Sequence, residues 1–302
     1  MRLTLSSLST LLLGLSFALT ACDNENEPNF QLGGGGTSTQ TISKGDAGRL
    51  EMPKLTGTSE ELFITHKTAP TTAYGDSVLN YAYAYDKRYF HSKWVAFRFD
   101  DDTRPRVVNR KDNKIRPQYP IDPKLPLMYA LASDLSFNGR DHGHLCASYD
   151  RLYSREANDQ TFYMSNMSPQ IASFNQDFWT AFENKVQTLG RDKSFADTLY
   201  VVKGGTLNDI DANTIYVATQ KMPVPKYYYM ALLKVKNGVY TAIGFYMEHK
   251  NYGVSGNEDH LRQYAVTIRD LEKNTGIDFF HNLPDLVENA VETTISLSAW
   301  RL

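Results

Sequence analysis

The strongest constraint on the fold of this 302-residue chain is a pair of apolar runs, Tyr227–Val235 and Val239–Tyr246, which Asn237-Gly238 joins. Both runs are rich in aromatic and β-branched residues, which favour strands. An Asn-Gly pair readily adopts the two positive φ angles of a tight hairpin turn. The two runs are therefore predicted to pair as antiparallel strands, so the chain must contain an antiparallel sheet.

Similar patterns elsewhere predict more strands and two helices. Short aromatic and β-branched runs predict strands at Glu61–His66, Asn80–Tyr85, Trp94–Phe99 and Leu199–Gly205. Apolar residues at helical spacing predict helices at Phe174–Leu189 and Glu258–Thr275, the second of which ends at Gly276. The proline-rich stretch Arg116–Pro126 predicts a loop. With no internal repeat and no second linker, residues 50–302 are predicted to form one α+β domain.

The first 21 residues are predicted to be a lipoprotein signal peptide. Met1-Arg2 gives a basic start, and the apolar stretch Leu11–Leu19 is too short for a good membrane span. The sequence Leu19-Thr20-Ala21-Cys22 resembles a bacterial lipobox, in which Cys22 is lipidated and anchors the mature chain to a membrane. A plain signal peptide that contains a cysteine is the alternative.

Residues 22–49 are predicted to be the lipidated cysteine and a flexible tether. Asp23–Glu27 is acidic and polar, and Gly33–Gly36 is a flexible run. An acidic stretch in this place resembles the surface-export signal of some bacterial lipoproteins, while simple solvation of a linker explains it equally well. The expected location is the outer membrane of a bacterium, and surface exposure is left open.

The overall charge does not mark the chain as a nucleic-acid binder, because the formal net charge is -2. One window is locally basic: Lys87–Arg116 holds ten Lys or Arg residues against four Asp, with aromatic residues between them. Such a window suits a phosphate backbone, but it is also typical of a solvated face over core aromatics. The two cysteines exclude a disulfide framework, and Cys146 is interpreted as a small buried residue.

A polar cluster in the middle of the chain, Asp141–His144, carries residue types that suit phosphodiester hydrolysis. His144 follows a glycine and can act as a general base. Mg²⁺ prefers oxygen ligands and keeps several waters, so the amide oxygen of Asn175 could be its one direct protein ligand. Asn175, Trp179 and Glu183 are spaced by four and are predicted to share a helix face distinct from the apolar stripe. Taken singly, such residues are more often a structural histidine, a helix cap and a solvated charge.

Three motifs in order then resemble one known family. They are Asp141-x-Gly143-His144, Ser165-Asn166-x-x-Pro169-Gln170 and Asn175-x-x-x-Trp179-x-x-x-Glu183. Together they resemble the DNA/RNA non-specific endonucleases, which have a ββα-metal (His-Me finger) core, and the resemblance covers roughly residues 60–290. It implies an α+β fold in which helices flank a mainly antiparallel central sheet. It also implies an endonuclease that hydrolyses DNA and RNA with Mg²⁺, or with Mn²⁺ in its place.

The same resemblance implies a role for each matching residue. His144 would be the general base for a water nucleophile, and Asn166 would support the site beside it. Asn175 would bind the metal directly, and Glu183 would act through water on the metal. Arg110 best matches the upstream arginine of the family, with Arg116 as a rival because no motif fixes that alignment.

One departure from the family pattern concerns His142, which stands where the family carries an arginine that contacts phosphate. Arginine is always charged and binds phosphate as a fork, whereas histidine is charged only at lower pH. Three interpretations follow. His142 still donates to phosphate, or Arg140, Arg151 or Arg155 supplies the charge, or the activity is much reduced.

Two main functions therefore compete. The first is a lipid-anchored, metal-dependent nuclease that acts on DNA and RNA backbones. The second is a catalytically weak nuclease-fold lipoprotein that binds extracellular nucleic acid. The sequence does not decide the preference between DNA and RNA, the product ends, the biological role or the oligomeric state, for which a homodimer is one option.

Overall fold

The computed structural model describes residues 45–72, 75–110, 114, 116–210, 215–217 and 220–302. Residues Ile42–Leu302 form one compact unit. The predicted signal peptide, Cys22 and most of the predicted tether lie outside the described residues. Among the helices of the described part, none is long and apolar enough to cross a membrane.

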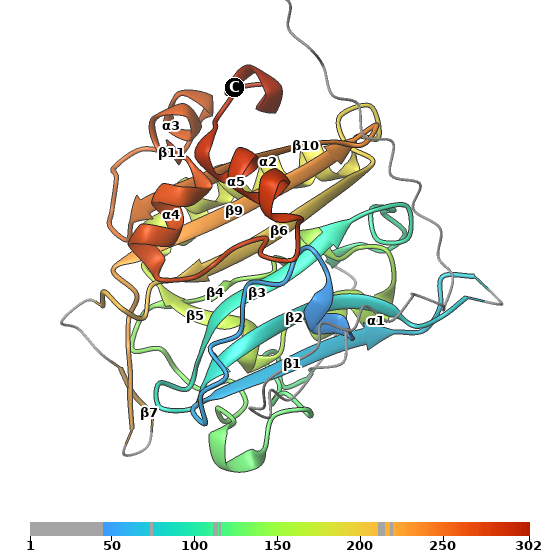
Figure 1. Cartoon of the computed structure of the whole chain (residues 1–302). Coiled ribbons are helices and arrows are strands. Elements are labelled where there is room, and N and C mark those ends of the chain that lie inside the picture. Colours follow the sequence, from blue (N-terminus) through green and yellow to red (C-terminus); the bar gives the residue numbers. More distant parts are fainter. Residues whose placement is uncertain (1–44, 73–74, 111–113, 115, 211–214, 218–219) are drawn as a thin grey trace, which may run out of the picture. The chain divides into compact units, whose positions relative to one another are not determined.

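A seven-stranded sheet forms the centre of this unit, with strand order β1-β2-β3-β6-β9-β10-β11 (Figure 1). Its strands are β1 (Glu61–Thr68), β2 (Val78–Asp86), β3 (His91–Phe99), β6 (Thr198–Gly205), β9 (Tyr227–Lys236), β10 (Val239–Glu248) and β11 (Ala265–Val266). Every neighbouring pair in this sheet is antiparallel. The predicted α+β class with a mainly antiparallel sheet is confirmed.

The predicted hairpin is the pair β9 and β10. Lys236 lies opposite Val239, and the turn residues Asn237 and Gly238 have φ angles of 50° and 76°. Two positive φ angles in a two-residue turn match the right-handed twist of the strands. The Asn-Gly signal therefore fixed the register of this part of the sheet.

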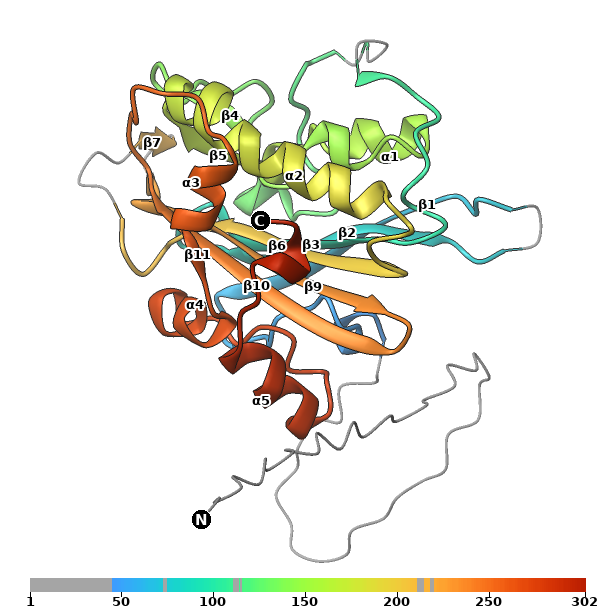
Figure 2. The same ribbon diagram turned by 90° about the horizontal axis from the view of Figure 1, so that it is seen from above.

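Both faces of the sheet are buried, and alternate residues of a strand serve opposite faces. In β2, Tyr81, Tyr83 and Tyr85 belong to one hydrophobic cluster, while Ala82 and Ala84 belong to a second. Figure 2 shows the helices on both sides of the sheet. On one side lie α1 (Arg155–Gln160) and α2 (Thr180–Arg191), and on the other lie α4 (Ile268–Thr275) and α5 (Asp285–Thr293).

The prediction of one helix over Glu258–Thr275 is wrong. The segment forms α3 (Glu258–Gln263), the short edge strand β11 and α4. Leu261 of α3 packs in the cluster of the α2 side, whereas Ile268 and Leu271 of α4 pack in the cluster of the opposite side. The chain thus passes the edge of the sheet, and Thr267 starts a new helix by accepting a hydrogen bond from the backbone N–H of Asp270.

The predicted helix over Phe174–Leu189 exists, but it begins with a π-helical turn, η6 (Phe174–Trp179), before α2. A π turn holds more residues than an α turn. Trp179 therefore stacks on Phe174, with ring centroids 5.8 Å apart, and is fully buried. The prediction that Trp179 faces away from the apolar stripe is wrong, because the wider turn rotates it into the core.

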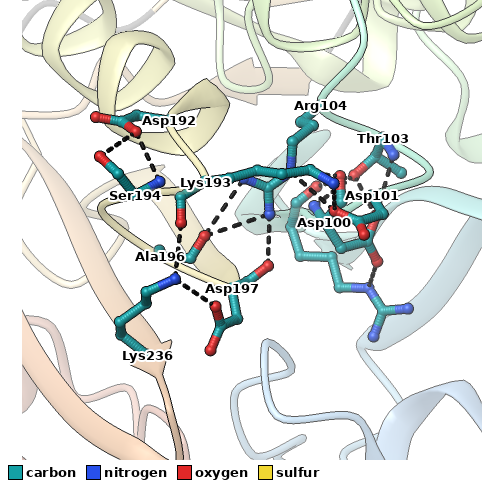
Figure 3. Close-up of polar contacts among 11 residues, drawn as sticks. Asp100, Asp101, Thr103, Arg104, Asp192, Lys193, Ser194, Ala196, Asp197 and Lys236 are labelled. Carbon is teal, nitrogen blue, oxygen red and sulfur yellow. Dashed lines mark hydrogen bonds and ion pairs between the residues drawn. The ribbon is translucent and has the colours of Figure 1, made fainter.

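A polar network holds the far end of α2 against the sheet (Figure 3). The Arg104 side chain, which follows β3, donates to the backbone carbonyls of Ala196 and Asp197 in the turn after α2. Lys236 at the end of β9 forms an ion pair of 2.8 Å with Asp197. These contacts fix the helix that carries Glu183.

Candidate active site

A small ββα unit sits on the α2 side of the sheet. Its strands, β4 (Asp141–His144) and β5 (Met167–Gln170), pair antiparallel with His144 opposite Met167, and η6 with α2 follows. Gly143 is required at the centre of this pair. A Cβ atom on Gly143 would lie 2.1 Å from Oε1 of Gln170, so no larger residue fits without displacing that side chain.

The unit opens into a pocket of about 550 Å³. It is lined by Arg110, Tyr119, Arg140, Asp141, His142, His144, Ala147, Ser148, Tyr149, Asn175, Gln176, Thr180 and Glu183. Of the residues predicted for catalysis and metal binding, all but Asn166 line this pocket. The structure therefore brings together residues that are far apart in the sequence.

His144 is held in the pocket wall between aromatic rings, with Phe162 edge-on at 5.2 Å between centroids. Burial, and then the positive charge of Arg110, lower the pKa of His144 to about 3. Its Nε2 atom has no hydrogen-bond partner among the described residues. The imidazole is therefore neutral at pH 7, with a ring nitrogen that is not engaged by the protein, as a general base requires.

Asn166 does not line the pocket but secures the chain just beyond His144. It is fully buried, and its Oδ1 accepts a hydrogen bond of 2.8 Å from the backbone N–H of Cys146. Its Nδ2 donates to the carbonyls of Cys146 and Thr161. Asn166 thus positions the end of β4. Cys146 is itself fully buried, and burial raises the pKa of its thiol, as suits a structural residue.

Asn175 is oriented by Asp141 across the ββα unit. Its Nδ2 donates to Oδ2 of Asp141 at 2.9 Å, and Nε2 of Gln176 donates to the same oxygen at 2.8 Å. This hydrogen bond identifies the amide nitrogen of Asn175, so the other atom of the amide is Oδ1. That oxygen has no hydrogen-bond donor among the described residues, so it is available to a cation.

Glu183 lies in the pocket wall above a buried ion pair. Its Oε1 accepts a hydrogen bond of 3.1 Å from the Trp179 indole and lies 3.8 Å from Nζ of Lys203. Lys203 is fully buried and lies 2.6 Å from Oδ2 of Asp150. Burial raises the pKa of Glu183 to about 7, although the charge of Lys203 and the indole hydrogen bond oppose the shift.

The sequence reasoning missed Lys203 and Asp150. A signal for Lys203 was present, since it is the one charged residue in the apolar strand run Leu199–Gly205. A lysine in a buried strand needs an anionic partner. Asp150 ends the 3₁₀ helix Ser148–Asp150, and nothing near it in the sequence marks it as that partner.

The chemistry of the donors fits a hard divalent cation. Asn175 and Glu183 both offer oxygen, the ligand atom that Mg²⁺ prefers, and one or two protein ligands suffice for an ion that keeps its waters. A trio of carboxylates whose oxygens lie within 4.8 Å of one another, Glu272, Asp278 and Glu292, lies outside this pocket. Arg269 already forms an ion pair of 2.7 Å with Glu292.

The arginines that were considered for phosphate binding lie in different places. Arg110 and Arg140 line the pocket, whereas Arg116 is exposed and does not. Arg151 is fully buried against the rings of Phe97 and Phe99, and Arg155 donates to the backbone of Asn109. Of the three arginines that could replace the charge at position 142, only Arg140 lies at the pocket.

The basic window Lys87–Arg116 does not form one continuous cationic face. Arg88 pairs with Asp86 at 2.6 Å, Lys93 with Glu61 at 2.7 Å and Arg98 with Asp100 at 2.6 Å. Several of its described positive charges are therefore balanced locally. Its contribution to the pocket comes from its later part, through Arg110.

His142 is packed as a structural residue. Its ring stacks between Tyr119, at 4.2 Å between centroids, and Phe137, at 4.5 Å. Its Nε2 donates to the carbonyl of Leu135 at 2.8 Å. Burial lowers the pKa of His142, so the ring is neutral at pH 7. A neutral imidazole with one nitrogen engaged does not replace the charge of an arginine.

The chain is similar in sequence to known nucleases. The family model of DNA/RNA non-specific endonucleases matches residues 59–286. The mitochondrial nuclease EXOG of Xenopus laevis is 30% identical over 217 residues, 68% of this chain and 58% of that protein. This chain thus spans just under three fifths of the length of that relative. Nuclease C1 of Cunninghamella echinulata var. echinulata is 28% identical over 214 residues, 68% of this chain and 81% of that protein.

Two further similarities are informative. The mitochondrial endonuclease G of Bos taurus is 26% identical over 227 residues, 71% of each protein. A solved structure of the EndoG/EndoGI complex contains a chain that superposes with a TM-score of 0.58 at 20% identity, covering 74% of this chain and 88% of that chain. The likeness at this identity establishes a shared fold.

Proposed function

Because this chain belongs to the family of DNA/RNA non-specific endonucleases, we propose that it hydrolyses phosphodiester bonds in DNA and RNA with a divalent cation, Mg²⁺ or Mn²⁺. One observation carries the proposal. A neutral histidine with an unengaged ring nitrogen, His144, shares a pocket with the amide of Asn175, whose oxygen accepts no hydrogen bond from the described residues.

Each residue then has a chemical task. His144 accepts a proton from the attacking water, which it can do because the imidazole is neutral at pH 7. Asn175 would hold the cation through Oδ1, and Glu183 would hold it through water. When bound, a divalent cation would offset the negative charge that develops on the phosphate. Asp141 keeps the amide of Asn175 in the required orientation.

Phosphate contacts account for a lack of sequence preference. Arg110 lines the pocket close enough to His144 to lower its pKa, so an anion bound there would lie beside the base. Contacts to the backbone read no base edges. Both DNA and RNA strands carry the same phosphodiester group, so this pocket suits either.

The test is cleavage of plasmid DNA and of RNA by the purified protein with Mg²⁺, with Mn²⁺ and with EDTA between pH 5 and 9. We expect cleavage of both substrates with either metal and none with EDTA. Wild-type protein that cleaves neither substrate under any of these conditions would refute the proposal and favour the binding-only alternative.

A matched pair of variants tests the metal ligand. Asn175→Ala should raise the Mn²⁺ concentration needed for half-maximal cleavage by at least tenfold, because it removes the direct ligand. Asn184→Ala lies on the exposed face of α2 and should behave as wild type. Mn²⁺ binding, followed by electron paramagnetic resonance without substrate, gives a second readout.

A further inference from the structure

The partners of the arginine side chains differ sharply across the described part of the chain. Eight arginines form ion pairs with carboxylates: Arg49, Arg88, Arg98, Arg104, Arg155, Arg262, Arg269 and Arg301. Arg151 and Arg191 donate to backbone carbonyls. A guanidinium nitrogen that is shielded from solvent and lacks an acceptor is unfavourable, so such a group points to a bound ligand.

Three arginines have side chains that make no hydrogen bond or ion pair with the described residues, and two of the three line the pocket. Arg110 and Arg140 line it, and Arg106 lies over the ring of Tyr149, which lines it too. An anion in this pocket would supply the missing partner. Two of the three arginines without a partner among the described residues thus line the pocket in which an anionic substrate would bind.

The backbone holds Arg140 at the end of a hydrogen-bonded turn. It ends a tight turn in which Asn138 and Gly139 have φ angles of 53° and 82°, and its backbone N–H donates to the carbonyl of Phe137 at 3.1 Å. Phe137 in turn stacks on His142, which donates to Leu135. His142 therefore holds the turn that presents Arg140.

The guanidinium of Arg140 has the atoms needed for a phosphate. Its Nε is shielded from solvent and has no partner among the described residues. Guanidinium groups bind phosphate oxygens through two parallel N–H groups. The two histidines in the lining, His142 and His144, both have lowered pKa values, so Arg110 and Arg140 supply the pocket's permanent positive charge.

We propose that Arg140 binds a phosphate of the nucleic-acid strand in this pocket. His142 then has a structural role: it holds the turn that carries Arg140 and does not itself bind phosphate. This inference rests on the proposed function, because it assumes a nucleic-acid substrate. The phosphate contact is thereby assigned to Arg140, two residues before His142, where the sequence departs from the family pattern.

Binding can be measured apart from cleavage. A fluorescein-labelled single-stranded oligonucleotide is titrated in EDTA with wild type, Arg140→Gln and Arg140→Lys, at several salt concentrations. Arg140→Gln should weaken binding about ten- to hundredfold, because it removes charge-assisted hydrogen bonds. It should also reduce the slope of log Kd against log salt by about 0.7, the value for one phosphate contact on a single strand.

Two further variants sharpen the test. Arg140→Lys keeps the charge but loses the fork, so it should retain the wild-type salt slope with an intermediate Kd. Arg262→Gln removes one positive charge from the exposed ion pair with Asp259 on α3, and should match wild type in both quantities. A general loss of folding would alter affinity without this pattern of slopes, and circular dichroism checks it directly.

The outcomes separate the two proposals. If wild type binds the strand but never cleaves it, the proposed function fails while the role of Arg140 in binding stands. If Arg140→Gln has the Kd and salt slope of wild type, the role of Arg140 is overturned. His142→Arg should lower the melting temperature without raising the cleavage rate. A tenfold gain in the cleavage rate would overturn the structural role of His142.

Discussion

The pKa values of two ionisable residues in the pocket, His144 and Glu183, are shifted in opposite directions. Burial is the first cause for both, since it disfavours the charged form of either group. It lowers the pKa of His144 to about 3 and raises that of Glu183 to about 7. The histidine is therefore neutral throughout the range from pH 5 to 9. The carboxylate is the group that titrates within that range.

The ionisation of Glu183 should set the pH dependence of cleavage. Glu183 is mainly protonated below about pH 7 and ionised above it, and the ionised form is the one that can act on a cation. At limiting Mg²⁺, the cleavage rate should rise with pH up to about 7 and then level off. Glu183→Gln should lower the rate and abolish this rise. A wild-type profile that falls between pH 6 and 8 would contradict the assignment.

The indole of Trp179 gives a separate test of the same carboxylate. Its hydrogen bond to Oε1 of Glu183 favours the ionised form and so lowers the pKa. Trp179→Phe keeps an aromatic ring in the core but removes the donor. The rise in rate should therefore move to higher pH, and an unchanged or more acidic midpoint would show that the hydrogen bond has no such effect.

Motifs in the sequence were enough to select His144, Asn175 and Glu183, because the chemistry of each residue and the order of the motifs are local information. The partners that tune these residues were not predictable in the same way. Lys203 belongs to β6, and it meets Glu183 only once the sheet has formed. The contrast between Arg140 and Arg151 likewise depends on burial, which neighbouring residues in the sequence do not reveal.

At the scale of elements, apolar periodicity identified strands well and helices less well. A stripe at helical spacing does not show whether its members pack on one face of a sheet or on both. Leu261 and Leu271 share such a stripe, yet β11 separates their helices and they lie in different clusters. The π turn before α2 is equally hidden, because it adds a residue to a turn without changing the pattern of apolar residues.

The β9–β10 turn offers a test of an element that the sequence did predict. Gly238 has a φ angle of 76°, and a Cβ atom in the left-handed region costs roughly 1 kcal/mol or more. Gly238→Ala should therefore lower the free energy of unfolding by about 1 kcal/mol in urea titrations. Asn237→Gly introduces a residue that tolerates a positive φ, so it should lower the free energy of unfolding by less. Equal stability of Gly238→Ala and wild type would contradict the observed turn.

For the whole molecule, the sheet acts as a platform on which distant segments build one pocket. Arg110 comes from the segment after β3, Asp141 from β4 and Glu183 from α2, while Lys203 supports the site from beneath. The antiparallel class could be predicted from strand patterns and from the family resemblance. The pocket could not, because its shape depends on how α2 and the loop before β4 pack against the sheet.

We also propose that the mature chain is anchored to a bacterial membrane through a lipid on Cys22, as its lipobox-like sequence indicates. Expressed with its leader in a bacterial host, wild type should appear in the membrane fraction and incorporate a labelled fatty acid. Cys22→Ser should do neither, while retaining nuclease activity. Labelling that persists in Cys22→Ser would exclude this anchor.

Removing the imidazole of His144 is the sharpest test of its role as the general base. His144→Ala should reduce the single-turnover cleavage rate of plasmid DNA about 10²- to 10⁴-fold. Mn²⁺ affinity, oligonucleotide binding and the circular dichroism spectrum should stay as in wild type, and added imidazole should restore part of the rate. A rate for His144→Ala within tenfold of wild type under the same conditions would contradict the claim.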